Sequence, residues 1–282
     1  MTLTQPGILY VVATPIGNLD DMSPRAVSIL KSVALIAAED TRHAQRLLQH
    51  YQIATPATAC HDHNETHKVQ QLIDHLQSGK SLALISDAGT PLISDPGFRL
   101  VRAAQEAMIK VVPIPGACAA ITALSASGLP SDRFRFEGFL AAKSTARRQQ
   151  LDSVRQERAT LIFYEAPHRI LDCLGDMVAI FGKEREACLA RELTKTFETI
   201  RKASLAELLY FVNTDPNQQK GEIVLLVTGA TGEEDKADHA KVDALLIRLL
   251  EDLPVKKAAQ LAAELCGYKK NELYQRALDL KN

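Results

Sequence analysis

The chain has no continuous apolar stretch long enough to cross a membrane, and its start lacks the basic-then-apolar pattern of a signal peptide. It also has almost no net charge, because 33 Lys and Arg stand against 34 Asp and Glu, which leaves a formal charge of −1. Any contact with nucleic acid must therefore come from a local basic patch. These absences predict a soluble, cytoplasmic protein.

Cysteine is scarce as well. The chain has five cysteines, an odd number, and no two of them form a C-x-x-C pair. This pattern predicts reduced thiols in the cytoplasm and argues against a disulfide framework or a zinc ribbon. The stretch "CHDHNETH" (60–67) holds three histidines, but their spacing matches no common zinc motif, so we predict a polar loop and no bound metal.

Two common nucleotide-binding motifs are missing. No G-x-G-x-x-G follows the first apolar run, and G-x-x-x-x-G-K-[ST] occurs nowhere in the chain. The first apolar run leads instead into "TPIGNLDD" (14–21), which contains a Pro-Gly turn. The usual dinucleotide and P-loop sites are therefore not predicted.

What the chain does have is an alternation of short apolar runs and amphipathic helical stretches. The runs 7–13, 34–39, 81–86 and 110–115 are nearly continuous in Val, Ile, Leu and Ala, which is typical of buried parallel strands. The fold class that this alternation predicts is α/β, with helices on both faces of a largely parallel sheet. We assign the first domain to residues 1–115.

The alternation of apolar runs and helical stretches changes after the stretch 113–130, which we expect to be a hinge. Residues 116–230 hold strand-like runs with fewer helices between them, which predicts a second α/β domain with a mixed, partly antiparallel sheet. A polar, acidic stretch follows, and we expect it to be a linker over 231–240. In 241–282, two short helices with alanines at their crossing flank Gly267, which indicates a helical module resembling a helix-turn-helix.

The stretch "SDAGTPLISDPG" (86–97) lies where a parallel strand ends, at the sheet edge where ligands bind in open α/β folds. Asp95 followed by Pro96 is typical of a helix N-cap. Capping does not explain Asp87 or Gly89. A cation site would need more oxygen ligands, and Pro91 lacks the amide that a phosphate site would use, so some other small molecule fits better.

Charged side chains gather at other strand ends. In 38–43, Asp40 is expected to cap a helix, whereas Glu39 and Arg42 have no such role. The stretches 161–169 and 190–199 each follow an apolar run and are rich in charge. A ligand-facing site and a solvated rim are both open interpretations.

Basic residues concentrate in two places, 143–150 and the C-terminal module. They are typical either of phosphate contacts or of a solvated helix face. Our candidates for contact with nucleic acid in these places and at the end of the second strand are Arg42, Arg147, Arg148, Lys256, Lys257, Lys269 and Lys270.

Seven motifs follow one another along the chain: "TPIGNLDD", "AAEDTRH", "SDAGTPLISDPG", "VPIPGACAAITALSASGLP", "FYEAPHR", "ARELTKTFET" and "KGEIVLLV". Taken in this order, they resemble one family, the tetrapyrrole-methylase-like (class III) S-adenosylmethionine methyltransferases, over about residues 7–228. The tetrapyrrole branch has G-x-G-P-G-D and G-G-D-P where this chain has "ATPIGN" and "DAGTP", and both departures resemble the RNA-modifying branch.

The resemblance implies two α/β domains with the cofactor, S-adenosylmethionine, in a cleft between them, and a homodimer. It implies methylation of a cytidine ribose at the 2′-oxygen in small-subunit (16S) ribosomal RNA, with the RNA or the assembled subunit as partner and with no metal or membrane involved. The alternatives are a tetrapyrrole or protein side-chain methyltransferase of the same fold, and a non-catalytic nucleic-acid-binding protein.

Carried over by position, the resemblance also implies site residues. Glu165, Glu192 and Lys195 are candidates for catalysis, while the general base stays open among Glu165, Glu192, Asp87, His168 and Glu39. We expect Asp87 mainly to shape the cofactor site and the charges of 165–169 and 190–198 to face the RNA. The implied cofactor contacts are Pro15, Ile16, Asp87, Ala88, Gly89, Thr90, Ile93, Cys118, Ala119, Glu165, Leu193 and Thr194.

Overall fold

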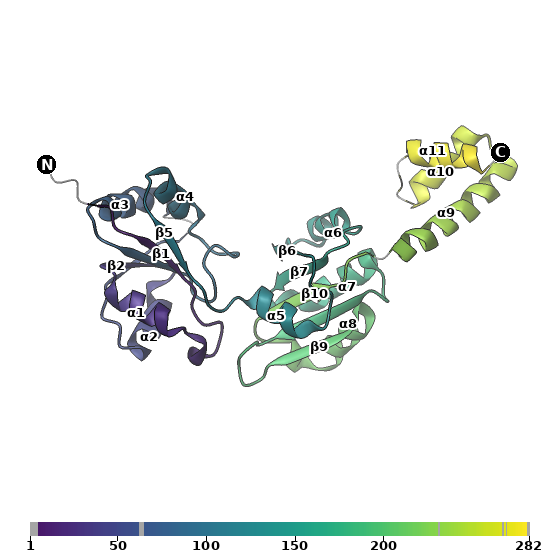
Figure 1. The fold of residues 1–282 in the computed structure, drawn as a ribbon. Coiled ribbons are helices and arrows are strands. Elements are labelled where there is room, and N and C mark those ends of the chain that lie inside the picture. The colour runs from purple at the N-terminus through teal and green to yellow at the C-terminus, as the bar shows by residue number, and fades with distance from the viewer. Residues whose placement is uncertain (1–4, 62–64, 231, 267, 269, 281–282) are drawn as a thin grey trace. The chain divides into compact units, whose positions relative to one another are not determined.

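The structure is a computed structural model that describes residues 5–61, 65–230, 232–266, 268 and 270–280 (Figure 1). The chain divides into two compact units, Met1–Thr228 and Gly229–Asn282. Two sheets form the first unit, and three helices form the second, within the part of the chain that is described. The two-sheet α/β architecture confirms the predicted fold class.

The first sheet is entirely parallel, and in the described residues it has the order β3-β2-β4-β1-β5. Four of its strands lie inside the apolar runs that predicted them. The short edge strand β3 has no such run, because only alanine and threonine form it, and it pairs with β2 alone. The strands are β1 (Leu9–Val12), β2 (Leu35–Ala38), β3 (Ala57–Ala59), β4 (Leu82–Ile85) and β5 (Val111–Ile114).

Helices cover both faces of this sheet (Figure 1). One hydrophobic core joins α1 and α2 to the sheet through Leu30 and Leu48, and a second core joins α3 and α4 to the other face. Ser23 caps α1 and Asp40 caps α2, as the sequence predicts. The helices are α1 (Pro24–Ser32), α2 (Thr41–His50), α3 (Glu65–Gln77) and α4 (Phe98–Glu106).

The start of α4 differs from the expectation that Asp95 caps it. The helix begins at Phe98, and its N-cap is Gly97, which makes no side-chain capping hydrogen bond. Gly97 has φ +122°, and a Cβ there would lie 2.6 Å from a methyl group of Leu84, so only glycine fits. Ser94 also has a positive φ, and this turn moves Pro96 out of the first helical position.

The second sheet is mixed, as predicted, with the order β6-β7-β10-β8-β9 in the described residues. Only β6 and β7 are parallel, and the other neighbours are antiparallel. Its central strand β10 is buried along its whole length. The strands are β6 (Phe134–Phe139), β7 (Thr160–Glu165), β8 (Glu186–Arg191), β9 (Thr199–Ser204) and β10 (Ile223–Val227).

The helices of the second sheet are distributed unequally between its faces. The largest core packs α6, α7 and α8 against one face, and α5 packs against the other face. Ile16, from the loop after β1, belongs to the same core as α5 and Leu193, so the first parallel sheet and the mixed sheet meet through this loop. The helices are α5 (Ala119–Ser127), α6 (Ser144–Ser153), α7 (Ile170–Phe181) and α8 (Leu205–Thr214).

The second unit has a small core of its own. Ala259 and Ala262 of α10 (Val255–Cys266) pack with Leu273 and Ala277 of α11 (Lys270–Asp279) and with Leu246 of α9 (Gly232–Asp252). Small residues at the crossing allow close approach of the helices, as predicted. Gly267, which we expected in the turn, lies outside the described residues.

The expected linker over 231–240 differs from the structure. Residue 231 is not described, and α9 already begins at Gly232. The segment contains two Glu and two Ala, which have high helix propensity, and acidic residues early in a helix suit the positive end of its dipole. Polarity alone therefore did not distinguish a solvated helix from a linker.

Candidate functional site

The loops after β1 and β4 meet at the carboxyl edge of the parallel sheet. β1 and β4 are neighbours, and beyond their last paired residues Thr14 and Gly89 form an isolated antiparallel bridge. The Thr14 N–H donates to the Gly89 carbonyl at 2.8 Å, and the Gly89 N–H donates to the Thr14 carbonyl at 3.1 Å. Gly89 has φ +85°, which favours glycine in this position.

Asp87 links the same edge to the loop after β2. Its carboxylate accepts a hydrogen bond from the backbone N–H of Asp40 at 3.0 Å. In return, the Asp87 N–H donates to the Glu39 carboxylate at 3.4 Å. These two contacts join the loops of neighbouring strands and fix where Asp87 lies, which supports the expectation that this residue shapes the wall of a site.

The mixed sheet contributes aromatic side chains from β6 and β7. The ring of Tyr164 packs edge-on against Phe136 and Phe139, with ring centroids 4.9 Å and 5.6 Å apart. The Ala120 N–H, in the first turn of α5, donates to the Tyr164 hydroxyl at 3.1 Å. Burial raises the pKa of Tyr164, and nearby Cys118 and Asp95 raise it further, so the hydroxyl stays protonated.

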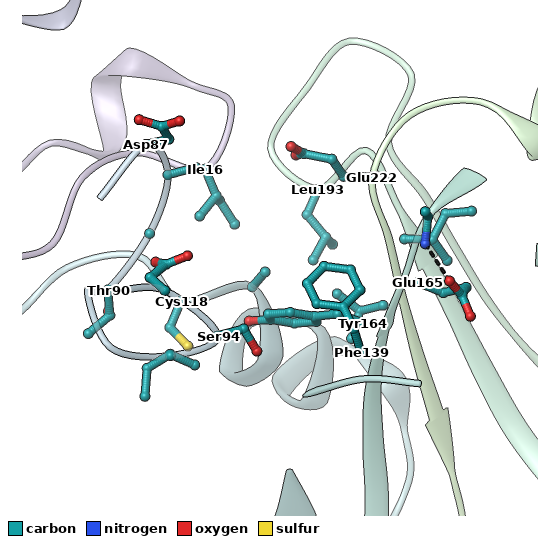
Figure 2. A pocket seen from close by; sticks show the side chains of 18 of the residues that line it. Ile16, Asp87, Thr90, Ser94, Cys118, Phe139, Tyr164, Glu165, Leu193 and Glu222 are labelled. Atoms are coloured by element: carbon teal, nitrogen blue, oxygen red, sulfur yellow. Dashed lines mark hydrogen bonds between the residues drawn. The ribbon is translucent and has the colours of Figure 1, made fainter. Parts of the chain in front are cut away.

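Glu165 follows Tyr164 on β7, and successive strand residues point to opposite faces. Tyr164 lies on the α5 side of the sheet, and the Glu165 side chain points away from it (Figure 2). The Glu165 carboxylate forms an ion pair of 2.5 Å with Arg169. Its side chain is completely buried, so it cannot face an RNA as we expected of 165–169. Burial and the neighbouring Glu165 carboxylate raise the pKa of the Cys173 thiol on the same side.

These loops and strand ends line a cavity of about 400 Å³ (Figure 2). This volume is within the range of small-molecule sites. Apolar and aromatic side chains such as Ile16, Leu193 and Tyr164 form much of the wall. Among the described residues that line it there is no Lys, Arg or His, whereas five are acidic: Glu39, Asp87, Asp95, Glu165 and Glu222.

The structure brings most of the expected cofactor contacts together around this cavity. Pro15 lines a neighbouring cavity instead, and Thr194 lines neither of the two. The Thr194 hydroxyl accepts a hydrogen bond from the Asn18 N–H at 3.1 Å, which ties the loop after β1 to the mixed sheet. The expected contacts that line the 400 Å³ cavity are Ile16, Asp87, Ala88, Gly89, Thr90, Ile93, Cys118, Ala119, Glu165 and Leu193.

The sequence did not predict several other residues that line the 400 Å³ cavity. Ser94 and Asp95 lie in a motif that we did single out, but we expected its second half to start a helix. Phe139, Ala190 and Val224 come from strands of the mixed sheet, where they look like ordinary apolar strand residues. Only the pairing of the strands shows that these positions share one side of the sheet.

A second cavity, of about 270 Å³, adjoins the first. Ile16, Asp87, Ala88 and Glu222 line both cavities and form the boundary between them. The second cavity has a different charge, because its other lining residues include three basic ones: His43, Arg46 and Lys195.

Lys195 lies between two carboxylates at this boundary. Its ammonium is 2.8 Å from Glu192 Oε1 and 3.0 Å from Glu222 Oε2. Burial opposes the charged form of both Glu192 and Lys195, but their ion pair outweighs it, so the pKa of Glu192 is lowered and that of Lys195 is raised. Two of the three candidate catalytic residues are therefore paired with each other and charged at neutral pH.

The loops after β4 and β8, which line the cavities, contain several residues with strained backbone conformations. Leu92 and Ser94 in one loop, and Glu192 and Thr194 in the other, have φ between +50° and +73°. Non-glycine residues rarely adopt this conformation, and where they do the surrounding structure must hold them in place. Gly221 meets the Glu192 carboxyl so closely that a Cβ would lie 2.3 Å from it.

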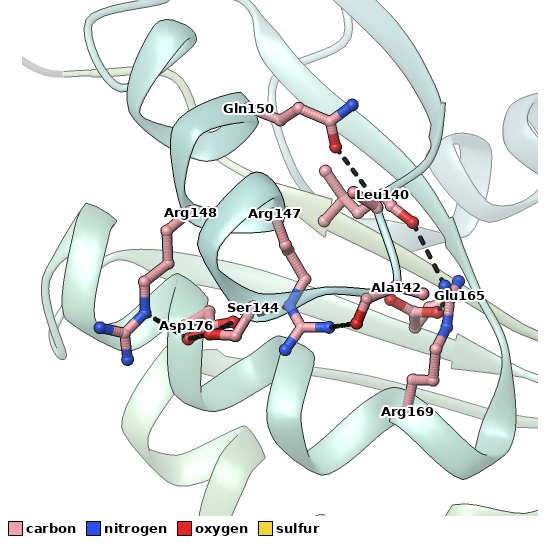
Figure 3. A network of polar contacts seen from close by, with 10 residues as sticks. Leu140, Ala142, Ser144, Arg147, Arg148, Gln150, Glu165, Arg169 and Asp176 are labelled. Carbon is pink, nitrogen blue, oxygen red and sulfur yellow. Dashed lines mark hydrogen bonds and ion pairs between the residues drawn. The ribbon is translucent and has the colours of Figure 1, made fainter.

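The expected RNA contacts differ in accessibility. Arg147 is buried, with its guanidinium 2.7 Å from Asp176, so its assignment to an RNA surface was wrong: the side chain is needed to pair an interior carboxylate (Figure 3). Arg191, in the charged stretch 190–199, is also buried and donates to Gln218 at 3.0 Å. The residues that are exposed are Arg42, Arg148, Lys256 and Lys257, while Lys269 and the side chain of Lys270 lie outside the described residues.

Neither a metal cluster nor a membrane span is found in the described part of the chain. No group of three or more His, Cys, Asp or Glu is arranged to hold a metal ion there. No described helix is long and apolar enough to cross a membrane.

Comparison with known proteins agrees with this architecture. The family model of the tetrapyrrole (corrin/porphyrin) methylases matches residues 8–209, and the model of the RsmI C-terminal HTH domain matches residues 236–281. A solved uroporphyrin-III-C-methyltransferase from Thermus thermophilus has the same fold, with a TM-score of 0.57 at 18% identity over 82% of this chain and 98% of that one.

Two curated relatives are much more similar in sequence. Both are named ribosomal RNA small subunit methyltransferase I. The one from Pseudomonas aeruginosa is 61% identical over 96% of this chain and 97% of its own length. The one from Haemophilus influenzae is 58% identical over 95% of each chain. The chain therefore belongs to the tetrapyrrole (corrin/porphyrin) methylase family, and within it to the group of ribosomal RNA small subunit methyltransferase I.

Proposed function

We propose that this protein transfers a methyl group from S-adenosylmethionine to the ribose 2′-oxygen of a cytidine in small-subunit ribosomal RNA. The relatives' names support the RNA substrate and the methyl transfer. The observation that supports a sulfonium cofactor is the 400 Å³ cavity, whose described lining is apolar and acidic without a basic side chain.

The lining fits S-adenosylmethionine on two grounds. A cationic sulfonium is stabilised by carboxylates, and a cavity without Lys or Arg disfavours phosphate-bearing cofactors. The rings of Phe139 and Tyr164 and the side chains of Ile16 and Leu193 offer apolar surface of the kind that an adenine ring requires. Gly89 allows the backbone of the loop after β4 to approach a ligand.

The bound cofactor would supply an electrophilic methyl group, whose carbon an oxygen nucleophile can attack in line with the departing sulfur, with no metal needed. A C–O bond forms at the 2′-oxygen, the C–S bond breaks to leave the thioether, and the hydroxyl proton must pass to a base. The chain's task is to align the hydroxyl and to stabilise the negative charge that develops on its oxygen.

Lys195 is suited to this charge stabilisation. It lines the second cavity beside the boundary with the cofactor cavity, and its raised pKa keeps it protonated, so it cannot act as the base. Glu192 and Glu222 hold its ammonium in place. In this proposal Glu192 positions Lys195, and Asp87 and Glu222 are the carboxylates that reach both cavities and can accept the proton.

Glu165 keeps a more modest role in this proposal. It lines the cofactor cavity through its place at the end of β7, while its carboxylate holds Arg169 on the opposite face. We therefore assign it to the support of the cofactor wall and not to proton transfer.

The family resemblance also supports a homodimer that acts in the cytoplasm, where small ribosomal subunits are found. Light scattering of the purified protein tests the oligomeric state, for which a mass of twice 30.9 kDa is expected.

The experiment that tests the function uses methyl-labelled S-adenosylmethionine with small ribosomal subunits, followed by alkaline hydrolysis. A methylated 2′-oxygen cannot attack the neighbouring phosphodiester, so the label is expected in an alkali-resistant dinucleotide that contains cytidine. Label in ordinary mononucleotides would show base methylation instead. Label in a tetrapyrrole or a protein, with none in the RNA, would overturn the proposal.

A further inference from the structure

We propose that the 270 Å³ cavity beside the cofactor site binds a phosphodiester of the acceptor RNA, and that Arg46 and His43 of α2 hold it. This inference rests on the proposed function and names the surface that would position the acceptor nucleotide.

The charge of the lining changes at the boundary between the cavities. The cofactor cavity has acidic side chains and no basic ones among its described lining residues. The second cavity shares Asp87 and Glu222 with it and adds three basic residues. Opposite charges on the two sides of one boundary suit a cationic methyl donor and an anionic acceptor that must meet there.

Arg46 and His43 are the basic residues that remain available. Lys195 is already paired with Glu192 and Glu222. In the described residues, by contrast, the side chains of Arg46 and His43 have no hydrogen-bond or ion-pair partner. Both are exposed on α2, so a ligand can reach them without any rearrangement.

The structure also fixes where these two side chains lie relative to the boundary between the two cavities. α2 begins directly after the Glu39-Asp40 loop, and Asp40 both caps the helix and donates its backbone N–H to Asp87. The buried residues Ala44 and Leu48 anchor α2 in the core of the parallel sheet. His43 and Arg46 are therefore attached to the same loop that positions Asp87 at the boundary.

Phosphate is the ligand that this arrangement favours. A guanidinium matches the geometry of two phosphate oxygens, and an imidazole N–H supplies a further donor. Phosphate contacts fix the register of an RNA strand without reading its sequence. A phosphodiester held in the second cavity would place the attached ribose at the boundary, next to the cofactor cavity.

The test measures methyl transfer to small subunits by the full chain and its Arg46→Gln variant, over a range of salt concentrations. We expect kcat/KM to fall at least tenfold, mostly through KM, while the affinity for S-adenosylmethionine is unchanged. The slope of log(kcat/KM) against log salt should decrease by about 0.7, which corresponds to one lost phosphate contact on single-stranded RNA. His43→Ala should have a smaller effect in the same direction.

Two variants control for charge and for folding. Arg102→Gln removes the same charge from α4, which packs on the opposite face of the parallel sheet, and should behave as wild type. Arg46→Lys keeps the charge and should retain the salt slope while it loses part of kcat/KM. A merely structural role for Arg46 would lower the thermal midpoint and would leave the salt slope unchanged.

The outcomes separate this inference from the proposed function. If the wild type methylates small subunits and Arg46→Gln has the same kcat/KM and salt slope, the inference is overturned and the proposed function stands. If the wild type transfers no methyl group to the RNA, the proposed function fails and the inference fails with it.

Discussion

At the scale of single residues, Asp87 shows how the sequence could identify a site residue and not its contacts. Its place after a buried strand predicts a ligand-facing position. The structure adds that its carboxylate accepts the Asp40 N–H and so joins two loops. Such a tertiary hydrogen bond depends on which strands are neighbours, and no local pattern in the sequence specifies that order.

We predict that Asp87→Ala weakens the binding of S-adenosylmethionine about tenfold. Loss of a hydrogen bond to a charged group costs about 1.5–3 kcal/mol, and here it also frees the loop that lines the cofactor cavity. Titration calorimetry with the cofactor measures the change. Asp132→Ala, an exposed aspartate outside both cavities, is the matched control. Normal cofactor affinity in Asp87→Ala would contradict the assigned role.

We predict that Gly221→Ala impairs both stability and methyl transfer. Gly221 has φ +78°, and the new Cβ would overlap the Glu192 carboxyl, which holds Lys195. Thermal denaturation and methyl transfer to small subunits measure the two effects. Gly175→Ala is the control, because a Cβ there meets nothing within 4 Å inside α7, and the change should stabilise the helix by up to about 1 kcal/mol. If Gly221→Ala and Gly175→Ala had the same thermal stability and methyl-transfer activity, the clash with the Glu192 carboxyl would be contradicted.

At the scale of elements, the sequence predicted strands better than it predicted helix starts. Continuous Val, Ile and Leu mark buried strands such as β4 and β10 because burial on both faces requires it. The start of α4 depends on the turn through Leu92 and Ser94, which both have positive φ values. Neither leucine nor serine predicts such a backbone conformation from the sequence. The sequence could not show whether Arg147 and Arg148 contact phosphate or lie on a solvated helix face. Only the packing of α6 on α7 places Asp176 beside them.

This α6–α7 contact is a polar network that supports the loop after β6 (Figure 3). Asp176 pairs with Arg147 at 2.7 Å and with Arg148 at 2.6 Å. Arg147 also donates to the Ala142 carbonyl at 3.2 Å, and Arg169 donates to the Leu140 carbonyl at 3.3 Å. The network thereby holds the loop that follows Phe139, a lining residue of the cofactor cavity.

We predict that Asp176→Asn lowers the free energy of unfolding by about 3–5 kcal/mol, because it leaves the buried Arg147 without its charge partner. Chemical denaturation measures this loss. Asp152→Asn, at an exposed position of α6, should change stability little. A loss below 1 kcal/mol in Asp176→Asn would contradict the importance of the network.

The same aspartate gives the wild type a pH dependence. Burial opposes ionisation of Asp176, but Arg148, Arg147 and Ser144 outweigh it and lower its pKa below the ordinary 3.8. A carboxyl whose pKa is lower in the folded state stabilises the fold above the unfolded-state pKa and loses this contribution as the pH falls through the folded-state pKa. The stability gap between wild type and Asp176→Asn should therefore shrink below about pH 4.

Lys195 lies in the loop after β8, and we predict that loss of its charge slows methyl transfer. Lys195→Met should lower kcat by about a hundredfold, as loss of one charge-stabilising donor does in other enzymes, with cofactor affinity little changed. Because the pKa of Lys195 lies above its ordinary 10.5, its deprotonation should not cause a loss of wild-type rate below that pH. Steady-state rates across the pH range test both points. Lys183→Met, at an exposed position before β8 that lines neither cavity, is the control.

At the scale of the whole molecule, the two units divide the proposed tasks. Every described residue that lines the 400 Å³ and 270 Å³ cavities belongs to the first unit, and the second unit has its own core. The motifs of the first unit identified its family because they line one site. The second unit was predicted as a helix-turn-helix-like module that binds RNA, with Lys256 and Lys257 among its candidate contacts. Both of these lysines are exposed in the structure.

A chain that ends at Thr228 should fold and bind S-adenosylmethionine as the full chain does, because every described residue that lines the two cavities belongs to the first unit. Its kcat/KM for small subunits should fall at least tenfold if the helical module contacts the RNA. Calorimetry with the cofactor and methyl-transfer kinetics measure the two properties. Undiminished kcat/KM would show that the module has no part in binding the substrate.

The central claim of this account is that the acidic cavity holds the methyl donor and that its boundary with the basic cavity is where the acceptor meets it. A crystal structure of the protein with S-adenosylmethionine tests this claim most directly. We predict that the cofactor fills the 400 Å³ cavity between Gly89, Tyr164 and Leu193, with its sulfonium on the side of Asp87 and Glu222. A cofactor bound in the basic cavity, or with its sulfonium turned away from that boundary, would contradict the account.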